Sequence, residues 1–465
     1  MSPADSIFLT FESRDAPLHI GGLQVFSPAA DGVDVAELYR RLVADDEVAD
    51  TFAKRARRSV ASGGQWAWEP DPYFDIEHHV RVHALARPGR VADLFALCSR
   101  LHGGLLDRSR PLWELHLIEG VQDGRFAIYF KAHHALMDGA AAQRLLSRAL
   151  SPDPDERGLR PLWAPRYGAV GEGPDAAGAA ESGVEQVARL LRTALSWASD
   201  VNGLPAAVVE SLKRGAAGRA APVSLAAPRS VLNVPITGSR RFAARSWPLA
   251  EFREISAAAG VTVNDVVLAA CSGALRRYLL EAGSLPDKPL VAMAPIALSV
   301  EGRDHDNGNA VAAVMCNLNT DLADPAARLA AIHQSMAEGK DELRGRTPHQ
   351  AIALTGLGMS PLALQLLPGV RSIARPPFNL VISNLAGPAR PLYLNGARLE
   401  ASYPLSVPYH GQALNITCIS YADELSFGFT GCRQQVPHLH RVPDYLDDEL
   451  SSLASATSTT GANSL

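Results

Sequence analysis

The chain has 465 residues, of which 44 are Lys or Arg and 49 are Asp or Glu, so its formal net charge at pH 7 is −5. Hydrophobic residues make up 47% of the chain, which is enough to bury a large core and excludes global disorder. The slight acidity argues against a nucleic-acid-binding protein, because neutralising phosphates requires a basic face. We therefore expect a globular protein whose partners do not include nucleic acid.

Five cysteines lie in mostly apolar surroundings and never at C-x-x-C spacing, which predicts buried, reduced thiols and a cytoplasmic protein: Cys98, Cys271, Cys316, Cys418 and Cys432. The first residues lack the basic region and apolar stretch of a signal peptide. No run of about 18 apolar residues occurs, so we expect any membrane contact to be peripheral.

The first part of the chain, residues 1–165, alternates helix-like and strand-like patterns. Residues 91–105 carry apolar side chains at helical spacing, residues 126–131 alternate like a strand, and residues 140–150 again follow a helical period. This alternation predicts an α/β domain.

A linker is expected over residues 166–230, where Pro, Gly and Ala accumulate without a period. Within it, residues 184–199 form an amphipathic helical pattern, which fits either a helix packed on its own protein or one lying on a membrane surface. Residues 211–250 contain seven arginines and lysines but no acidic residue: Lys213, Arg214, Arg219, Arg229, Arg240, Arg241 and Arg245. A solvated loop, lipid headgroups and nucleotide phosphates all remain open as explanations for this charge.

The last part, residues 231–465, again mixes both periods. Helical patterns cover residues 249–259, 263–280 and 324–339, and strand-like patterns cover residues 290–297, 379–383, 413–421 and 425–430. We therefore predict an α/β fold built from two domains joined by the linker.

One strand-to-helix loop carries the most chemical information. The run of residues 126–131 leads into His133 and His134, and Asp138 and Gly139 close a turn before the next helical pattern. Neighbouring residues on an extended backbone point in opposite directions, so we expect one histidine to face a cleft and the other to be structural. With an ordinary pKa of about 6.5, an imidazole is suited to act as a general base.

The rest of this loop is expected to support that histidine. Asp138 could orient the loop by accepting hydrogen bonds from backbone or cationic partners. Gly139 would permit a backbone turn that a side chain would obstruct.

Other reactive arrangements have weaker support. The pair His78 and His79 lacks a following Asp-Gly and is predicted to lie on the surface or on a strand. No cluster with metal-ligand spacing occurs, so no metal site is predicted. There is no G-x-S-x-G nucleophile motif and no Walker-type phosphate loop, so we expect direct transfer between two bound substrates without a tightly bound cofactor.

The motif from His133 to Gly139 resembles the H-H-x-x-x-D-G signature of the chloramphenicol acetyltransferase and condensation-domain superfamily. Further blocks are similar to those of the bacterial wax ester synthase/diacylglycerol acyltransferase family, and with the chain's first residues they spread the resemblance over nearly its whole length: residues 17–22, 111–114, 264–269, 378–384 and 411–416. One departure is the run after Asn384, where this chain has Leu-Ala-Gly-Pro in place of the family's usual Val-Pro-Gly-Pro.

The resemblance implies two chloramphenicol acetyltransferase-like domains with an active-site tunnel at their interface. It also implies transfer of a fatty acyl group from acyl-CoA, the co-substrate, to diacylglycerol or a long-chain alcohol. The family's base is the second histidine of the pair, which places that role on His134, with His133 and Asp138 in support.

Further candidate site residues lie in these blocks and, for Arg240 and Arg241, in the basic segment of residues 211–250. Asn264 is expected to donate to the oxyanion, although it could instead cap the helix that it opens. Trp113 would pack beside the tunnel or belong to the core. Ser383 and Asn384 would line the acceptor or cofactor path, and Arg240 and Arg241 would contact the phosphates of CoA.

Two other functions stay open at this point. A condensation-type acyltransferase could use a carrier-bound acyl group or a specialised lipid, and a lipid-inclusion protein could carry the motif without catalysis. For the acyltransferase, we expect a cytoplasmic protein associated peripherally with the inner face of the membrane or with lipid inclusions.

Overall fold

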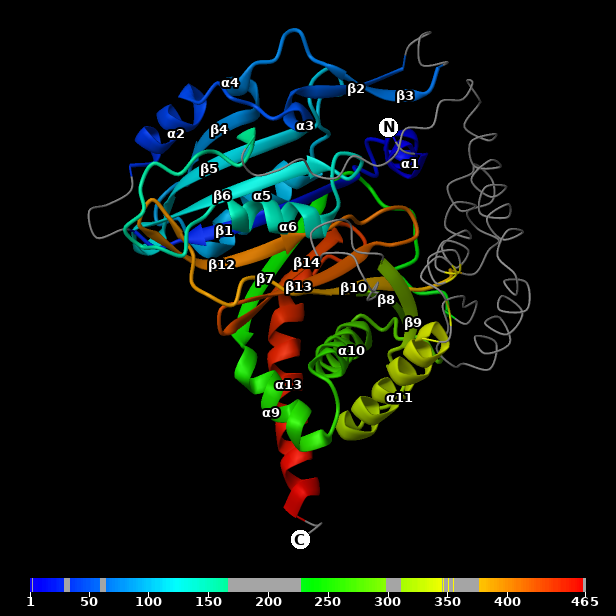
Figure 1. Ribbon diagram of the computed structural model, residues 1–465. Helices are drawn as coiled ribbons and strands as arrows, with labels where there is room; N and C mark the ends of the chain where they lie inside the picture. The colour runs from blue at the N-terminus through cyan, green and yellow to red at the C-terminus, as the bar shows by residue number, and fades with distance from the viewer. Residues whose placement is uncertain are drawn as a thin grey trace.

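The structure is a computed structural model that describes residues 1, 3–28, 34–58, 64–165, 227–297, 311–344, 346, 350, 354 and 376–462. The predicted helix over residues 184–199, most of the linker and the basic residues Lys213, Arg214 and Arg219 lie outside these residues. The described part folds around two six-stranded sheets and a small two-stranded sheet (Figure 1).

The N-terminal sheet has the strand order β11-β12-β1-β6-β5-β4. Its strands are β1 (His19–Phe26), β4 (Val80–Ala84), β5 (Trp113–Val121), β6 (Arg125–His133), β11 (Tyr393–Leu394) and β12 (Ala397–Leu405). Its neighbouring strands are antiparallel except for β4 and β5, which are parallel. The helical elements of this half are α1 (Pro3–Phe11), α2 (Val35–Ala44), α3 (Asp50–Ala53), α4 (Ile76–His79), α5 (Val91–Gly103), η1 (Gln122–Gly124) and α6 (Gly139–Arg148). A separate hairpin joins β2 (Lys54–Arg58) to β3 (Trp66–Pro70).

The C-terminal sheet has the order β7-β14-β13-β10-β8-β9. Its strands are β7 (Arg240–Pro248), β8 (Val291–Ala297), β9 (Val311–Asn317), β10 (Leu380–Leu385), β13 (Leu414–Tyr421) and β14 (Glu424–Cys432). The central strand β10 is parallel to both of its neighbours, and the outer pairs are antiparallel.

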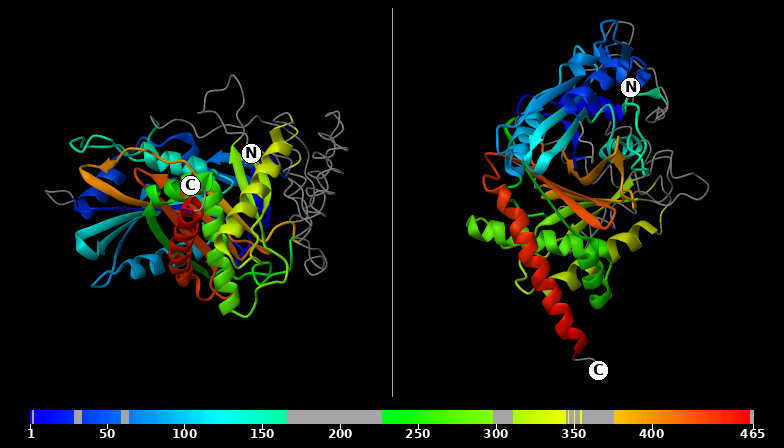
Figure 2. Two further views of the ribbon diagram at one scale, coloured as in Figure 1. Left: turned by 90° about the horizontal axis from the view of Figure 1, so that it is seen from below. Right: turned by 90° about the vertical axis from the view of Figure 1, so that its left-hand side faces the viewer.

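Four helices gather on the side of the C-terminal sheet that faces away from the N-terminal sheet (Figure 1). They are α9 (Leu249–Ala259), α10 (Val263–Glu281), α11 (Pro325–Arg344) and α13 (Val442–Ala462), and the short η3 (Leu439–Arg441) leads into the last of them. The helices pack on one another and share one large apolar core with the sheet. The far end of α13 extends beyond the sheets, as Figure 2 shows.

The two halves of the chain are interleaved, because β12 lies late in the sequence but belongs to the N-terminal sheet. It pairs with β1 from Gly21↔Leu405 to Phe26↔Leu399 and also packs against β13 and β14. A Cβ atom on Gly428 of β14 would come within 1.9 Å of the carbonyl oxygen of Pro404, so glycine is required where these strands cross. A chain boundary at residue 231 therefore does not separate the two sheets.

The interface is also fixed by polar contacts. The backbone N–H of Phe242 on β7 donates to Ser99 Oγ on α5 at 2.9 Å, and His102 Nε2 lies 2.9 Å from the carbonyl oxygen of Ser406. Because these partners come from both halves, the hydrogen bonds define how the halves sit on one another.

Most elements with a clear period agree with the sequence-based prediction. The pattern over residues 263–280 corresponds to α10, that over residues 91–105 to α5, and that over residues 126–131 to β6. All five cysteines are free and buried, as predicted. Among the described residues no single helix is long and apolar enough to span a membrane, although α9 and α10 together, bent by 103°, pass that test by length and composition.

His79 differs from its prediction, since it lies on α4 and is buried in the core instead of on the surface or on a strand. Its ring stacks on Trp113 with centroids 4.6 Å apart, and its Nδ1 lies 2.8 Å from the Trp113 carbonyl oxygen. Burial lowers the pKa of His79 to about 4, although the bond to Trp113 partly opposes this shift.

The neutral form of His79 is therefore favoured in the folded protein, and the free energy of unfolding should fall as the pH drops from about 6.5 towards 4. A shift of this size is equivalent to up to about 3 kcal/mol. His79→Asn keeps a donor near the position of Nδ1 but does not titrate. We therefore expect the free energy of unfolding to fall less with decreasing pH in this variant than in the wild type. Urea unfolding of both proteins at pH 7.5, 6.5 and 5.5 measures this free energy. An equal fall in the two proteins would contradict the prediction.

Candidate active site

The loop between β6 and α6 presents the two histidines differently. His133 is the last residue of β6 and is fully buried, whereas His134 is partly exposed. The backbone N–H of His134 donates to the Leu18 carbonyl oxygen at 2.9 Å, which joins the loop to the residue before β1. Only His134 therefore has access to a bound substrate.

Both ring nitrogens of His133 face protein groups. Its Nδ1 accepts a hydrogen bond from the backbone N–H of Ala135 at 3.0 Å, so in the neutral ring the proton is on Nε2. Nε2 lies 3.4 Å from Oε1 of Glu12, a carboxylate that follows α1. His133 thus serves the structure of the loop.

The ring of His134 stacks on Phe8 of α1, with centroids 4.1 Å apart and an interplanar angle of 14°. Burial lowers the pKa of His134, while a hydrogen bond to its own backbone and the charge of Asp138 raise it in part. The lowered pKa favours the neutral imidazole, which is the form that a general base requires.

Asp138 and Gly139 begin the helix after the loop. Asp138 is the N-cap of α6, and its Oδ1 accepts the backbone N–H of Ala141 at 2.7 Å. Gly139 differs from its prediction: a Cβ there would have nothing within 4 Å, so a side chain would not obstruct the turn. The structure instead leaves open space beside the loop at this position.

The two asparagines predicted from separate blocks meet in the C-terminal half. Nδ2 of Asn384 on β10 donates to Oδ1 of Asn264 on α10 at 3.4 Å. The N-cap of α10 is Thr262, which forms a capping box with Asp265, so Asn264 is not the cap. Within the described residues Nδ2 of Asn264 forms no hydrogen bond and remains as a donor. Among the described residues no hydrogen bond joins this pair to His134.

Ser383 and Asn384 are neighbours on β10 and therefore point to opposite faces of the sheet. Asn384 faces α10, so Ser383 faces away from this helix. The two side chains therefore lie on opposite faces of β10, and their place on a substrate path stays a prediction.

Trp113 is a core residue. It is completely buried, its Nε1 donates to the Phe52 carbonyl oxygen at 2.9 Å, and its ring packs against His79 and Trp163. Of the two open interpretations, the structure favours the core aromatic, since no face of the ring is left for a substrate.

The two arginines proposed for CoA are both held by backbone carbonyls. Arg240 is buried, with its guanidinium donating to Thr237 and Pro408, and burial lowers its pKa to about 10. Arg241 is more accessible and donates to the Pro437 carbonyl oxygen at 2.8 Å. Arg240 thus stabilises the region between the halves and is not accessible to a phosphate.

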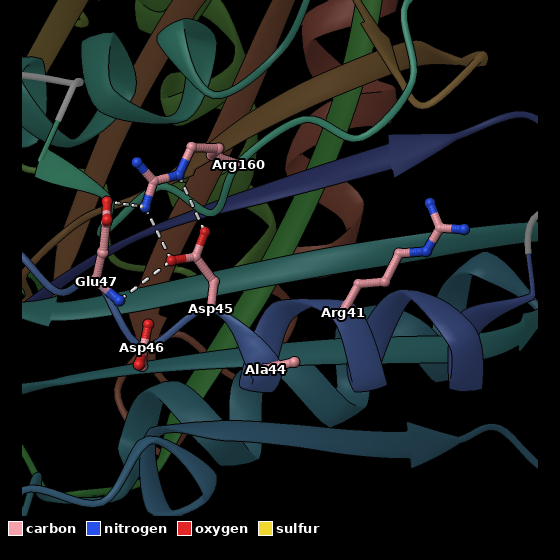
Figure 3. A pocket seen from close by; sticks show the side chains of 6 residues that line it. All are labelled: Arg41, Ala44, Asp45, Asp46, Glu47 and Arg160. Carbon is pink, nitrogen blue, oxygen red and sulfur yellow. Dashed lines mark hydrogen bonds and ion pairs between the residues drawn. The ribbon is translucent and has the colours of Figure 1, made fainter.

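A surface hollow of about 450 Å³ occurs elsewhere, at the C-terminal end of α2 (Figure 3). Its lining includes Asp45 and Glu47, which pair with Arg160 at 2.9 and 2.7 Å. Helix α2 and the histidine-covering α1 lie at opposite ends of the N-terminal sheet (Figure 1). The hollow is therefore remote from the histidines, and the tunnel stays a prediction. Within the described residues no His, Cys, Asp or Glu cluster is arranged to hold a metal ion.

Glu12 was not predicted from the sequence. Its partners His19, Arg108 and His133 lie at irregular distances from it in the sequence. It also follows a short amphipathic segment, where a carboxylate is usually solvated. Proximity to the sequence block at residues 17–22 is the only signal that could have drawn attention to it.

Two family models and several known proteins match this chain. The model of the wax ester synthase/diacylglycerol acyltransferase catalytic domain matches residues 1–267, and that of the WS/DGAT C-terminal domain matches residues 307–454. A probable diacylglycerol O-acyltransferase of Mycobacterium tuberculosis is 45% identical over 462 residues, covering 98% of this chain and 99% of the relative. A putative diacylglycerol O-acyltransferase of Mycobacterium bovis is 43% identical and covers 97% and 90%.

Solved structures are also similar to this chain. The wax ester synthase/diacylglycerol acyltransferase from Marinobacter aquaeolei superposes with a TM-score of 0.81 at 39% identity, covering 98% of this chain and 99% of that one. The starter condensation domain of rhizomide synthetase has a TM-score of 0.57 at 16% identity, covering 98% and 94%, and shows the fold alone. These matches confirm the predicted α/β fold. The chain belongs to the wax ester synthase/diacylglycerol acyltransferase family.

Proposed function

We propose that this protein transfers a long-chain fatty acyl group from acyl-CoA to the hydroxyl of diacylglycerol or of a long-chain alcohol, with His134 as the general base. The observation that carries the proposal is the difference in access between the two histidines. His134 is partly exposed and its lowered pKa favours the neutral imidazole, whereas His133 is fully buried with both ring nitrogens facing protein groups.

The reaction needs one proton to move twice. The imidazole of His134 takes the proton of the acceptor hydroxyl as the hydroxyl oxygen attacks the thioester carbonyl carbon. The resulting tetrahedral intermediate collapses, the carbon–sulfur bond breaks, and the imidazolium returns the proton to the CoA thiolate. The base is regenerated, and no covalent acyl-enzyme is required.

The oxyanion of the intermediate needs a hydrogen-bond donor, and Asn264 is suited to supply it. Its Oδ1 is already engaged by Asn384, which orients the amide and turns Nδ2 away from that partner. Thr262 caps the helix in its place, so the side chain of Asn264 is not needed to satisfy the backbone of α10.

The substrates are supported by the relatives, which are named diacylglycerol O-acyltransferases, and by the Marinobacter structure, which is named for both activities. Acyl-CoA is the acyl donor in this scheme and leaves as CoA. Both kinds of acceptor are water-insoluble, which supports a protein that works peripherally at the cytoplasmic face of the membrane or on lipid inclusions.

Purified protein given long-chain acyl-CoA should release CoA only when an acceptor is present, and in equal amount to the ester formed. Diacylglycerol and hexadecanol are offered in separate reactions, each dispersed in the same detergent. Free CoA without an acceptor would indicate hydrolysis instead of transfer. No CoA with either acceptor would contradict the proposal and favour a lipid-binding role.

A further inference from the structure

The carboxylate of Glu12 is a buried charge with donors on both oxygens. Its side chain is only 1% exposed. Oε1 accepts the backbone N–H of Leu18 at 3.1 Å and lies 2.9 Å from His19 Nε2, and Oε2 accepts two bonds from Arg108 at 2.9 and 3.1 Å. Burial raises the pKa of Glu12, but His133 and His19 more than offset this, so the pKa lies well below its ordinary value. The group is therefore an anion across the working pH range.

Glu12 reaches His134 through the peptide of Leu18 and through His133. The N–H of Leu18 donates to Glu12, and the carbonyl of the same residue accepts the backbone N–H of His134. On the other side, His133 presents its Nε2 to the carboxylate. One charged group thus fixes the backbone on both sides of the proposed base.

The same residue holds the helix that covers His134. The backbone N–H of Glu12 donates to the carbonyl oxygen of Phe8 at 3.0 Å, which ends α1, and the ring of Phe8 stacks on the imidazole. The carboxylate anchors this end of α1 through Leu18 and Arg108, so we expect its loss to loosen the helix and admit water to His134.

We propose that Glu12 is a positioning residue for His134, which it holds through Leu18, His133 and the stacked Phe8. The inference rests on the proposed function of His134 as the base. Glu12 touches neither substrate nor reacting atoms, and its contribution is the fixed orientation of the imidazole and its separation from water. A misplacement of about 1 Å in such a group can cost on the order of 100-fold in rate.

Glu12→Gln is the direct test, because an amide must turn its NH₂ group towards either Arg108 or the donors on the other oxygen. We expect kcat to fall about 10- to 100-fold, while KM for acyl-CoA changes less than threefold. Glu12→Asp keeps the charge on a shorter side chain and should recover part of the lost rate.

A matched control is Glu342→Gln. Glu342 is also a nearly buried carboxylate, with its side chain 2% exposed and paired to Arg346, but it lies on α11 in the C-terminal half. We expect this variant to lower Tm without changing kcat. If Glu12→Gln lost activity only in proportion to its unfolded fraction, the proposal would fail.

The pH profile gives a readout that stability alone does not move. The pKa of His134 is raised by the charges of Asp138 and Asp5 and lowered by that of His133. Loss of the nearby negative charge of Glu12 would by itself lower the pKa of His134, whereas the entry of water would raise it. We expect the second effect to dominate in Glu12→Gln and to move the acid limb of kcat/KM to higher pH. Glu342→Gln should leave that limb in place.

The titration of His134 can also be followed without turnover, by NMR of histidine-labelled protein assigned with the His134→Ala variant. A wild type that transfers no acyl group would refute the proposed function but still allow this comparison. The same His134 titration in wild type and Glu12→Gln, or a kcat within twofold of wild type, would overturn the positioning role. The two failures are thus distinguishable.

Discussion

Replacing His134 by alanine should lower kcat for ester formation by about 10²- to 10⁴-fold, because the acceptor hydroxyl then loses its proton only to water. KM for acyl-CoA should change little, since the imidazole acts on the transferred proton and does not anchor the thioester. Ester and free CoA, quantified over time with the better acceptor, measure the loss.

The control for His134→Ala is a substitution at its neighbour. His133→Gln disturbs the contact with Glu12 and the Ala135 backbone, so it should lower Tm and affect kcat less than His134→Ala does. Equal ester formation by wild type and His134→Ala would show that His134 is not the base. A larger loss in His133→Gln than in His134→Ala, at equal folded fraction, would reverse the roles of the two histidines.

Asn264→Ala should lower kcat by about 10²- to 10³-fold, the usual cost of removing one oxyanion donor. The thermal stability should hardly change, because Thr262 caps α10 and Asn264 does not. The decisive comparison is thus between rate and stability in the same preparation.

Thr262→Ala provides the opposite pattern. Removing this cap should lower the free energy of unfolding by about 1 kcal/mol, with kcat maintained. Steady-state kinetics and thermal unfolding of both variants test the pair. An Asn264→Ala variant with full activity and reduced stability would assign Asn264 a structural role instead.

The sequence predicted long apolar helical elements even where they are buried on every side, as α10 is over residues 265–275. The apolar period over residues 263–280 predicted α10 almost to its last residue, Glu281. In contrast, β1 has all eight of its residues buried and contains Gly21 and Gly22, so neither alternation nor strand propensity marks it. The N-terminal sheet therefore could not be assembled from the sequence.

The candidate site was likewise predictable from the sequence only in part. The H-H-x-x-x-D-G loop was evident, because its residues are adjacent in the chain and its strand and helix have clear periods. Glu12 could not be predicted, since its partners His19, Arg108 and His133 come together only when α1, β1 and β6 are folded. The burial of Trp113 and Arg240 likewise depends on contacts between distant segments.

The position of β12 has a consequence for how such proteins can be divided or recombined. β1 bonds β6 on one side and β12 on the other, so a fragment that stopped before β12 would expose a full row of unpaired backbone groups along β1. Two family models match successive stretches of the chain, but neither stretch contains a complete set of sheet partners. Exchanging halves between relatives would therefore replace β11 and β12, the two strands at one edge of the N-terminal sheet, and the whole chain is the smallest unit that can be transplanted.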